Sequence, residues 1–205
     1  MAFFTKDSVH QLAASQGIGT RGMLNESVER RFQAISSNSP LSSAKDESRK
    51  AIGSKTFNIF LSHSSLDASL VLAIYTVLTS RGYHVYLDRI HDRNLNRQNV
   101  TRHTADVIRK RMTQCDSLFV ATTSNTPQSK WVPWELGFTD GLTGNAAILP
   151  IVDNIYSSFA GLTYFDLYPT VGDRPSHVWS NDLEITERNG HVSPWGSWIH
   201  GPKAY

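Results

Sequence analysis

The chain has 205 residues, 40% of them hydrophobic and 19% charged, which suits one domain with a proper core plus appendages. A net charge of +2 is too small to indicate nucleic-acid binding, and the eight histidines lack metal-site spacing, so we expect neither nucleic acid nor metal. The single Cys115 excludes an internal disulfide; without a signal-peptide pattern or an apolar run of about 20 residues, we expect a cytoplasmic protein with no membrane partner.

Residues 1–54 alternate short apolar patches with Ser, Asn and Gly. Two helices are predicted, at 8–14 and 26–35; the second is the stronger because its apolar residues recur at helical spacing and Asn25 can cap it. The Ser-rich stretch 35–43 follows as a linker. We expect a helical arm, which either covers the main domain or forms an assembly surface.

From residue 55 the pattern changes to alternating strands and helices. The predicted strands lie at 57–61, 84–88, 117–122 and 147–152, with a possible edge strand at 164–168, and the predicted helices at 66–80, 104–112 and 133–142. Nearly continuous apolar strands that alternate with amphipathic helices indicate a parallel sheet covered on both faces. The pattern alone fits many doubly wound folds.

The last zone, residues 172–205, is poor in regular patterns. Trp179, Trp195 and Trp198 stand among Gly, Pro, Ser and Asn. We expect an irregular extension whose tryptophans cover the end of the core. A partner surface is the alternative, since aromatic anchors also dominate protein interfaces.

Two segments have sequences that are more informative about the protein family than the overall pattern. Residues 129–137, Ser-Lys-Trp-Val-Pro-Trp-Glu-Leu-Gly, follow the third strand and place a carboxylate beside two tryptophans, and residues 57–67, Phe-Asn-Ile-Phe-Leu-Ser-His-Ser-Ser-Leu-Asp, lead from a buried strand into a small polar loop. Together they resemble a Toll/interleukin-1 receptor (TIR) domain of the bacterial kind. The resemblance implies a flavodoxin-like parallel sheet over residues 55–171, between the arm at 1–54 and the extension at 172–205.

In an open parallel sheet, ligands bind beyond the carboxyl ends of the strands. Ser62, His63 and Ser64 follow the first predicted strand, and Asp88 ends the second. TIR enzymes hold their nucleotide at this place, so the resemblance implies that these four residues bind substrate. A hydroxyl here can instead cap the next helix, and we expect Ser65 to do so.

Glu135 matches the carboxylate with which some TIR domains cleave NAD, and Trp131 would form an aromatic wall beside it. The alternative is structural, with Trp131 packed under the helix and Glu135 placed where the helix dipole favours a negative charge. Pro133 fits only the first turn of a helix, so Trp131 is expected just before the helix and not one full turn below Glu135.

One carboxylate suffices for this reaction because nicotinamide leaves as a neutral pyridine, whereas the leaving oxygen of a glycoside needs a second carboxyl. NAD would be the substrate, with no resident cofactor. Water as acceptor gives ADP-ribose, internal attack gives a cyclic isomer, and an outside nucleophile gives a conjugate. The sequence does not choose among these products.

Residues 88–102 occupy the place of the BB loop of TIR domains and are rich in arginine, including Arg93, Arg97 and Arg102. The loop is either solvated, or its arginines hold the pyrophosphate, or it docks on a neighbouring protomer. We include Arg93 among the expected substrate-binding residues and expect self-association through this loop.

The resemblance therefore implies an NAD glycohydrolase or ADP-ribosyl cyclase that acts in bacterial anti-phage immunity, with a possible downstream effector that senses its nucleotide product. Two alternatives remain. A non-catalytic TIR adaptor would use the same loop for homotypic contact, and a nucleoside deoxyribosyltransferase-like enzyme would share the parallel fold and a carboxylate.

Overall fold

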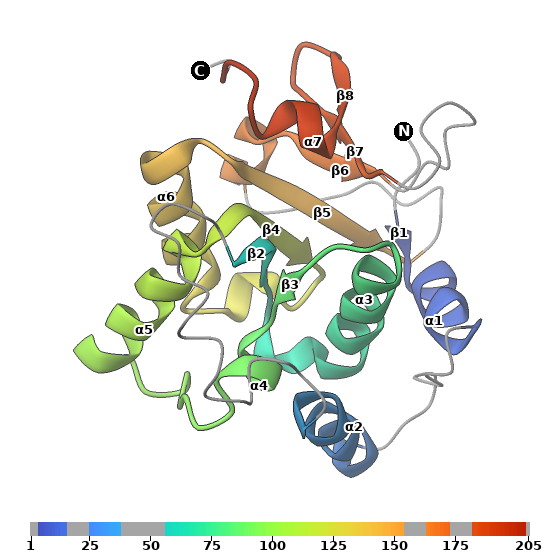
Figure 1. Ribbon diagram of the computed structural model, residues 1–205, viewed down its shortest axis with the longest axis vertical. Helices are drawn as coiled ribbons and strands as arrows, with labels where there is room; N and C mark the ends of the chain where they lie inside the picture. Colours follow the sequence, from blue (N-terminus) through green and yellow to red (C-terminus); the bar gives the residue numbers. More distant parts are fainter. Residues whose placement is uncertain (1–3, 16–24, 38–55, 154–162, 173–181, 204–205) are drawn as a thin grey trace.

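A parallel sheet runs through the middle of the fold, with helices on both faces (Figure 1). The computed structural model describes residues 4–15, 25–37, 56–153, 163–172 and 182–203. The parallel strands are β2 (Phe57–Ser62), β3 (Val85–Tyr86), β4 (Cys115–Thr122), β5 (Ala146–Val152) and β6 (Thr170–Gly172). They lie side by side as β3-β2-β4-β5-β6, the flavodoxin-like order of doubly wound folds, so the predicted fold class is confirmed.

The central strands are buried on both faces, which explains their nearly continuous apolar sequence. In β4, Leu118 and Val120 face one core, whereas Phe119 and Ala121 face the other. Strands β2 and β4 pair in register from Phe57 opposite Cys115 onward. A shift by one residue would exchange the two faces, so this register is strongly specified.

Two groups of helices cover the sheet. On one face lie α1 (Lys6–Ser15), α2 (Asn25–Ser37) and α3 (Ala68–Ser80), and on the other lie α5 (Arg102–Thr113) and α6 (Val132–Thr143) (Figure 1). Helix α6 ends at Gly144, whose φ of 66° is the left-handed conformation that glycine adopts without strain. No helix in the described parts of the chain is long and apolar enough to cross a membrane.

The N-terminal arm packs on the sheet and its helices. Its first strand, β1 (Phe4–Thr5), runs parallel to β5, with Phe4 opposite Ile151. Helix α1 lies against α3 and buries Val9, and helix α2 buries Val28 and Phe32 in the same core. The arm thus covers the main domain; the assembly role stays a prediction, and the predicted 35–43 linker lies outside the described residues after residue 37.

Two predicted boundaries are wrong near the sheet rim. Residues Ser65–Asp67 form a 3-10 turn, η3, so the helix begins at Ala68 and Leu66 is 60% exposed. Asp67 accepts hydrogen bonds from Thr123 and Asn125, which holds the turn in this orientation. Strand β3 ends at Tyr86, and the predicted strand residue Asp88 instead begins a short helix, α4 (Asp88–His91).

Two predictions for the C-terminal part of the chain are also wrong. The possible edge strand at 164–168 is a 3-10 helix, η5 (Thr163–Leu167), which turns Phe165 into the core; strand pairing starts only where the carbonyl of Pro169 accepts from the amide of Ile148. The described part of the extension is not irregular. It forms two strands, β7 (Glu184–Thr186) and β8 (Val192–Pro194), which extend the sheet antiparallel from β6. A short helix, α7 (Trp195–Trp198), follows them.

The extension is fastened to the sheet by aromatic side chains. Trp195 and Trp198 are buried in the core, as predicted, and Trp179 lies outside the described residues. The Trp195 indole donates to the Ser117 hydroxyl over 3.0 Å and packs edge-on against Tyr83. These tertiary contacts hold the extension in a regular structure that its local sequence pattern did not predict.

Candidate active site

The carboxyl ends of three parallel strands bring four polar residues together. Ser62 ends β2 and His63 follows it, Asp88 begins the short helix after β3, and Glu135 lies in the first turn of α6, after β4. All four residues are at most 8% exposed. The fold therefore gathers residues from distant parts of the sequence into one buried polar cluster.

Glu135 is fully buried at the centre of this cluster. The Ser62 hydroxyl donates to Oε2 of Glu135 over 2.5 Å, and Arg97 pairs with Oε1. Trp131 is the residue just before α6, as expected from Pro133, but its carbonyl accepts from the Glu135 amide, so Trp131 does lie one helical turn before Glu135, contrary to that expectation. These two contacts hold the buried carboxyl group in a fixed orientation.

Arg97 joins the two carboxylates of the cluster. Its Nη1 donates to Oδ2 of Asp88 over 2.7 Å, while Nη2 pairs with Glu135. Trp131 holds the same stretch of loop, because its Nε1 donates to the Arg97 carbonyl over 2.7 Å and its ring centroid lies 5.8 Å from the guanidinium carbon. Arg97 is thus fixed by its side chain and its backbone.

The start of the 88–102 loop is fastened to helix α5. Asp92 accepts two hydrogen bonds from Arg111, of 2.7 and 2.8 Å, and one from the hydroxyl of Tyr86 over 2.7 Å. Bidentate arginine–carboxylate pairs add geometric specificity to their energy. The loop is therefore anchored at Asp92 and again at Arg97.

The environment shifts the pKa values of the three titratable groups in different ways. Burial raises the pKa of Glu135, against the opposing effects of the Arg97 charge and the Ser62 hydrogen bond. Burial acts in the same direction on Asp88, but the charge of Arg97 and its hydrogen bond outweigh it and hold the pKa of Asp88 below its usual range. Burial also lowers the pKa of His63, so its ring is neutral at pH 7.

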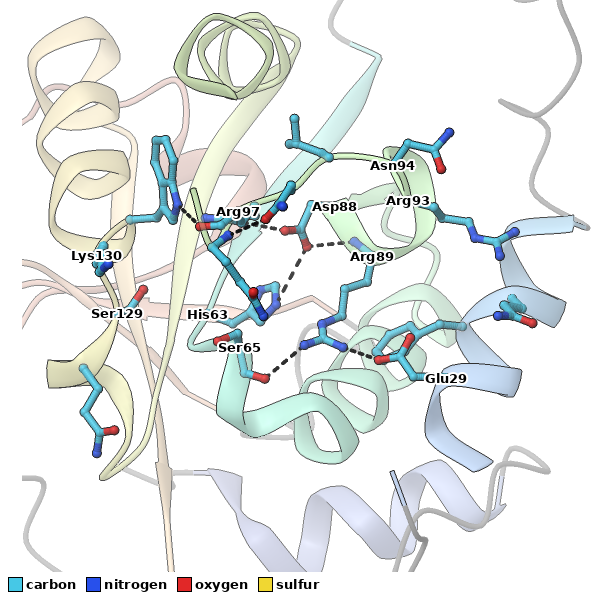
Figure 2. A pocket seen from close by; sticks show the side chains of 17 residues that line it. Glu29, His63, Ser65, Asp88, Arg89, Arg93, Asn94, Arg97, Ser129 and Lys130 are labelled. Atoms are coloured by element: carbon cyan, nitrogen blue, oxygen red, sulfur yellow. Dashed lines mark hydrogen bonds and ion pairs between the residues drawn. The ribbon is translucent and has the colours of Figure 1, made fainter. Parts of the chain in front are cut away.

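A cavity of about 750 Å³ opens beside the cluster (Figure 2). His63, Asp88, Arg97 and Trp131 line it, whereas Glu135 does not. Its volume is within the range of about 300–1,000 Å³ that is usual for small-molecule sites. Arg97 therefore stands between the cavity and the buried carboxylate.

The remaining predicted residues lie around this cavity in different roles. Ser64, not Ser65, caps the 3-10 turn, since its hydroxyl accepts from the Leu66 amide over 3.4 Å; the predicted cap was one residue late. Ser65 lines the cavity instead. Arg93 also lines it and is exposed, and Figure 2 shows its side chain on the side of the view where α2 lies.

Two features of the site were missed from the sequence. Arg97 was noted only as one of several loop arginines, and its pairing with Glu135 joins residues 38 positions apart, for which no local pattern exists. Glu29, Phe32 and Gln33 of helix α2 line the cavity, although the helix was expected to be a cover or an assembly surface. The helical spacing of the apolar residues predicted that Phe32 is buried, but it did not predict that the helix lines a cavity.

The arrangement suits electrostatic stabilisation of a positive charge. Glu135 offers a fixed, fully buried carboxyl group, Trp131 lines the cavity beside Arg97, and exclusion of water strengthens such an interaction. Within the described parts of the chain, no group of three or more His, Cys, Asp or Glu side chains is placed to hold a metal ion.

The sequence of this chain is similar to those of known proteins. Residues 59–177 match the sequence profile of the TIR domain family. A probable 3' cyclic ADP-D-ribose synthase of Bacillus cereus is 45% identical over 118 residues, which are 57% of this chain and 61% of that protein. A protein of Cytobacillus dafuensis, provisionally named a cyclic ADP-D-ribose synthase, is 30% identical over 94 residues, 45% of this chain and 25% of that protein. The matches thus span less than two thirds of either relative.

Proposed function

Because the chain belongs to the TIR domain family, we propose that it is an enzyme that cleaves the bond between nicotinamide and ribose in NAD. The observation that carries the proposal is the fully buried Glu135, at the carboxyl end of the sheet and behind a cavity of about 750 Å³. Relatives named as cyclic ADP-D-ribose synthases support the same substrate, since cyclic ADP-ribose forms from NAD by loss of nicotinamide.

The role of Glu135 follows from the charge that develops in this reaction. The bond from C1 of the ribose to the pyridine nitrogen breaks, and both electrons go to nicotinamide, which leaves neutral. The ribose becomes a cation, which the ionised carboxylate of Glu135 stabilises. A nucleophile then bonds to C1 and gives up its proton to water, so no second catalytic carboxyl is needed.

The site as it stands is closed, and Arg97 closes it. A ribose in the cavity reaches Glu135 only after the guanidinium of Arg97 releases Oε1. Once released, Arg97 can bind the pyrophosphate of the same substrate bidentately, as planar guanidinium groups do. Asp88 and His63 remain on the cavity wall to bind the hydroxyl groups of the ribose.

For the product, we propose a cyclic ADP-ribose formed by internal attack of the substrate's own adenosine part. The names of the two relatives support this choice over ADP-ribose or a conjugate. Cyclisation requires that the far end of the substrate folds back over C1 and that water is kept out. Mass spectrometry with chromatographic separation distinguishes the cyclic isomers from ADP-ribose by mass and from one another by retention.

Replacement of the carboxylate tests the proposal directly. Glu135→Gln keeps the shape and the Ser62 contact but removes the charge, and we expect nicotinamide release to fall by roughly 100-fold or more. The matched control is Glu187→Gln, the same change at a half-buried residue beside a C-terminal turn, which does not line this cavity. Nicotinamide release by Glu135→Gln at the wild-type rate, with an unchanged circular-dichroism spectrum, would reject the assignment.

The same assay separates the alternatives. A non-catalytic adaptor would release no nicotinamide from NAD at any protein concentration. A deoxyribosyltransferase-like enzyme would exchange bases on nucleosides and leave NAD intact. Both substrates are therefore offered to the wild-type protein side by side.

Self-association through the 88–102 loop is the partner contact that we propose. The support is that the loop carries Arg97, which must move, and exposes Arg93 and Val100, the latter 63% exposed. If a neighbour holds the loop open, specific activity rises with protein concentration, because mass action populates the associated state. Activity strictly proportional to protein over a wide dilution series would speak for a self-sufficient monomer.

For the biological role, we propose an anti-phage response in which the nucleotide product signals to an effector. Family resemblance supports this role. Bacteria that carry the wild-type gene are expected to survive phage challenge better than bacteria with Glu135→Gln at equal protein levels. Equal survival of the two strains would reject a defence role that depends on catalysis.

A further inference from the structure

Helix α2 forms one wall of the candidate active site, although it lies outside the matched family segment of residues 59–177. Phe32 is 1% exposed and anchors the helix in the core, while Glu29 and Gln33 are exposed along the cavity. The Ser36 hydroxyl donates to the Ile90 carbonyl over 2.6 Å and fastens the end of α2 to α4. The wall is therefore a built part of the site.

Arg89 connects this wall to the rest of the cavity. Its Nη1 pairs with Oε1 of Glu29, its Nη2 donates to the Ser65 carbonyl over 3.0 Å, and its guanidinium carbon lies 5.6 Å from the ring centroid of Phe32. The Glu29 side chain is 52% exposed, so its carboxylate remains accessible to a molecule in the cavity. Glu29 also offsets the positive charge of Arg89.

Glu29 lines the cavity from the side of helix α2. Figure 2 shows Lys130 and Ser129 on one side, Glu29 on the other, and Asp88 and Arg97 between them. This inference rests on the proposed function, which places the nicotinamide ribose of NAD near Arg97 and the buried carboxylate behind it. On first binding, before the far end folds back over C1 for ring closure, the other ribose, beyond the pyrophosphate, extends to the α2 wall.

We propose that Glu29 selects substrates whose distal ribose carries free hydroxyl groups. A carboxylate accepts hydrogen bonds from the two hydroxyls of a ribose but repels a phosphate at the 2' position, which is how acidic residues favour NAD over NADP in other nucleotide sites. Here Glu29 has a second effect, since it neutralises Arg89, the nearby cation that would otherwise attract such a phosphate. Glu29 is thus a specificity-determining residue.

The test measures binding, which does not depend on turnover. ADP-ribose and its 2'-phosphorylated counterpart are titrated by calorimetry into wild type, Glu29→Gln and the control Glu187→Gln. For wild type we expect tighter binding of ADP-ribose. In Glu29→Gln the preference falls by about tenfold or more, the order expected when one charge repulsion is removed at a half-exposed site.

A second variant tests the part assigned to Arg89. In Glu29→Gln the guanidinium lacks its carboxylate, so the share of the affinity gain for the 2'-phosphate that Arg89 supplies is expected to disappear in the double variant Glu29→Gln/Arg89→Gln, whereas the share due to the removed repulsion remains. An unchanged preference in Glu29→Gln, an equal change in Glu187→Gln, or no binding of ADP-ribose to wild type overturns the inference. The shifted preference together with no nicotinamide release from NAD rejects only the proposed reaction.

Discussion

Arg97→Met is the change that most directly tests how the candidate site is built. The side chains of Glu135, Asp88 and Arg97 are 0%, 9% and 15% exposed, so the three charges are largely removed from water. Loss of one partner from a buried ion pair leaves the other charge without compensation, which costs about 3–5 kcal/mol of folding free energy. We expect a loss in this range at neutral pH.

The loss should depend on pH, with a sign that the pKa shifts determine. Burial already raises the pKa of Glu135, and removal of Arg97 deletes a group that opposes the rise. A carboxyl whose pKa is higher in the folded than in the unfolded protein stabilises the fold at low pH and loses that contribution as pH rises through the folded value. The destabilisation by Arg97→Met should therefore be smaller at about pH 5 than at about pH 7.5.

Urea unfolding followed by circular dichroism measures this difference at both pH values. The double variant Arg97→Met/Glu135→Gln is the control, because an uncharged amide restores part of the stability at neutral pH. A loss below about 1 kcal/mol, typical of solvated ion pairs, or the same loss at both pH values, would mean that water reaches Glu135 and would refute a closed site.

Three further changes have expected outcomes. Ser62→Ala removes a hydrogen bond that lowers the pKa of Glu135, so the acidic limb of the pH profile of kcat/KM should move to higher pH; an unmoved limb would contradict this coupling. Trp131→Phe keeps an aromatic wall but loses the hydrogen bond to the 88–102 loop, so calorimetry should show about 1 kcal/mol less stability and proteolysis faster cleavage in this loop. Tyr83→Phe deletes the hydroxyl that binds residues 182–183 of the extension, and about 1–3 kcal/mol of stability should be lost in urea; no loss would show that the aromatic packing holds the extension alone.

The fold was predictable because its signals are local. The strands at 57–61, 117–122 and 147–152 are apolar on both faces, and the helices between them carry one apolar stripe each. A few neighbouring residues are therefore enough to predict whether each element is a strand or a helix. The same reasoning failed at 164–168, where a short apolar run fits a strand and a turn equally well. In the structure this segment forms a 3-10 helix in which Phe165 is buried in the core.

The sequence by itself determined the doubly wound sheet, the rim where its loops meet, and Glu135 as the carboxylate to examine. Only the tertiary structure decided that Arg97 covers Glu135 and that Glu29 of helix α2 faces the same cavity. Both contacts join segments that are far apart in the chain, and the physical reason is general. Strand and helix patterns repeat every two or about 3.6 residues, whereas ion pairs and cavity walls depend on where whole elements pack.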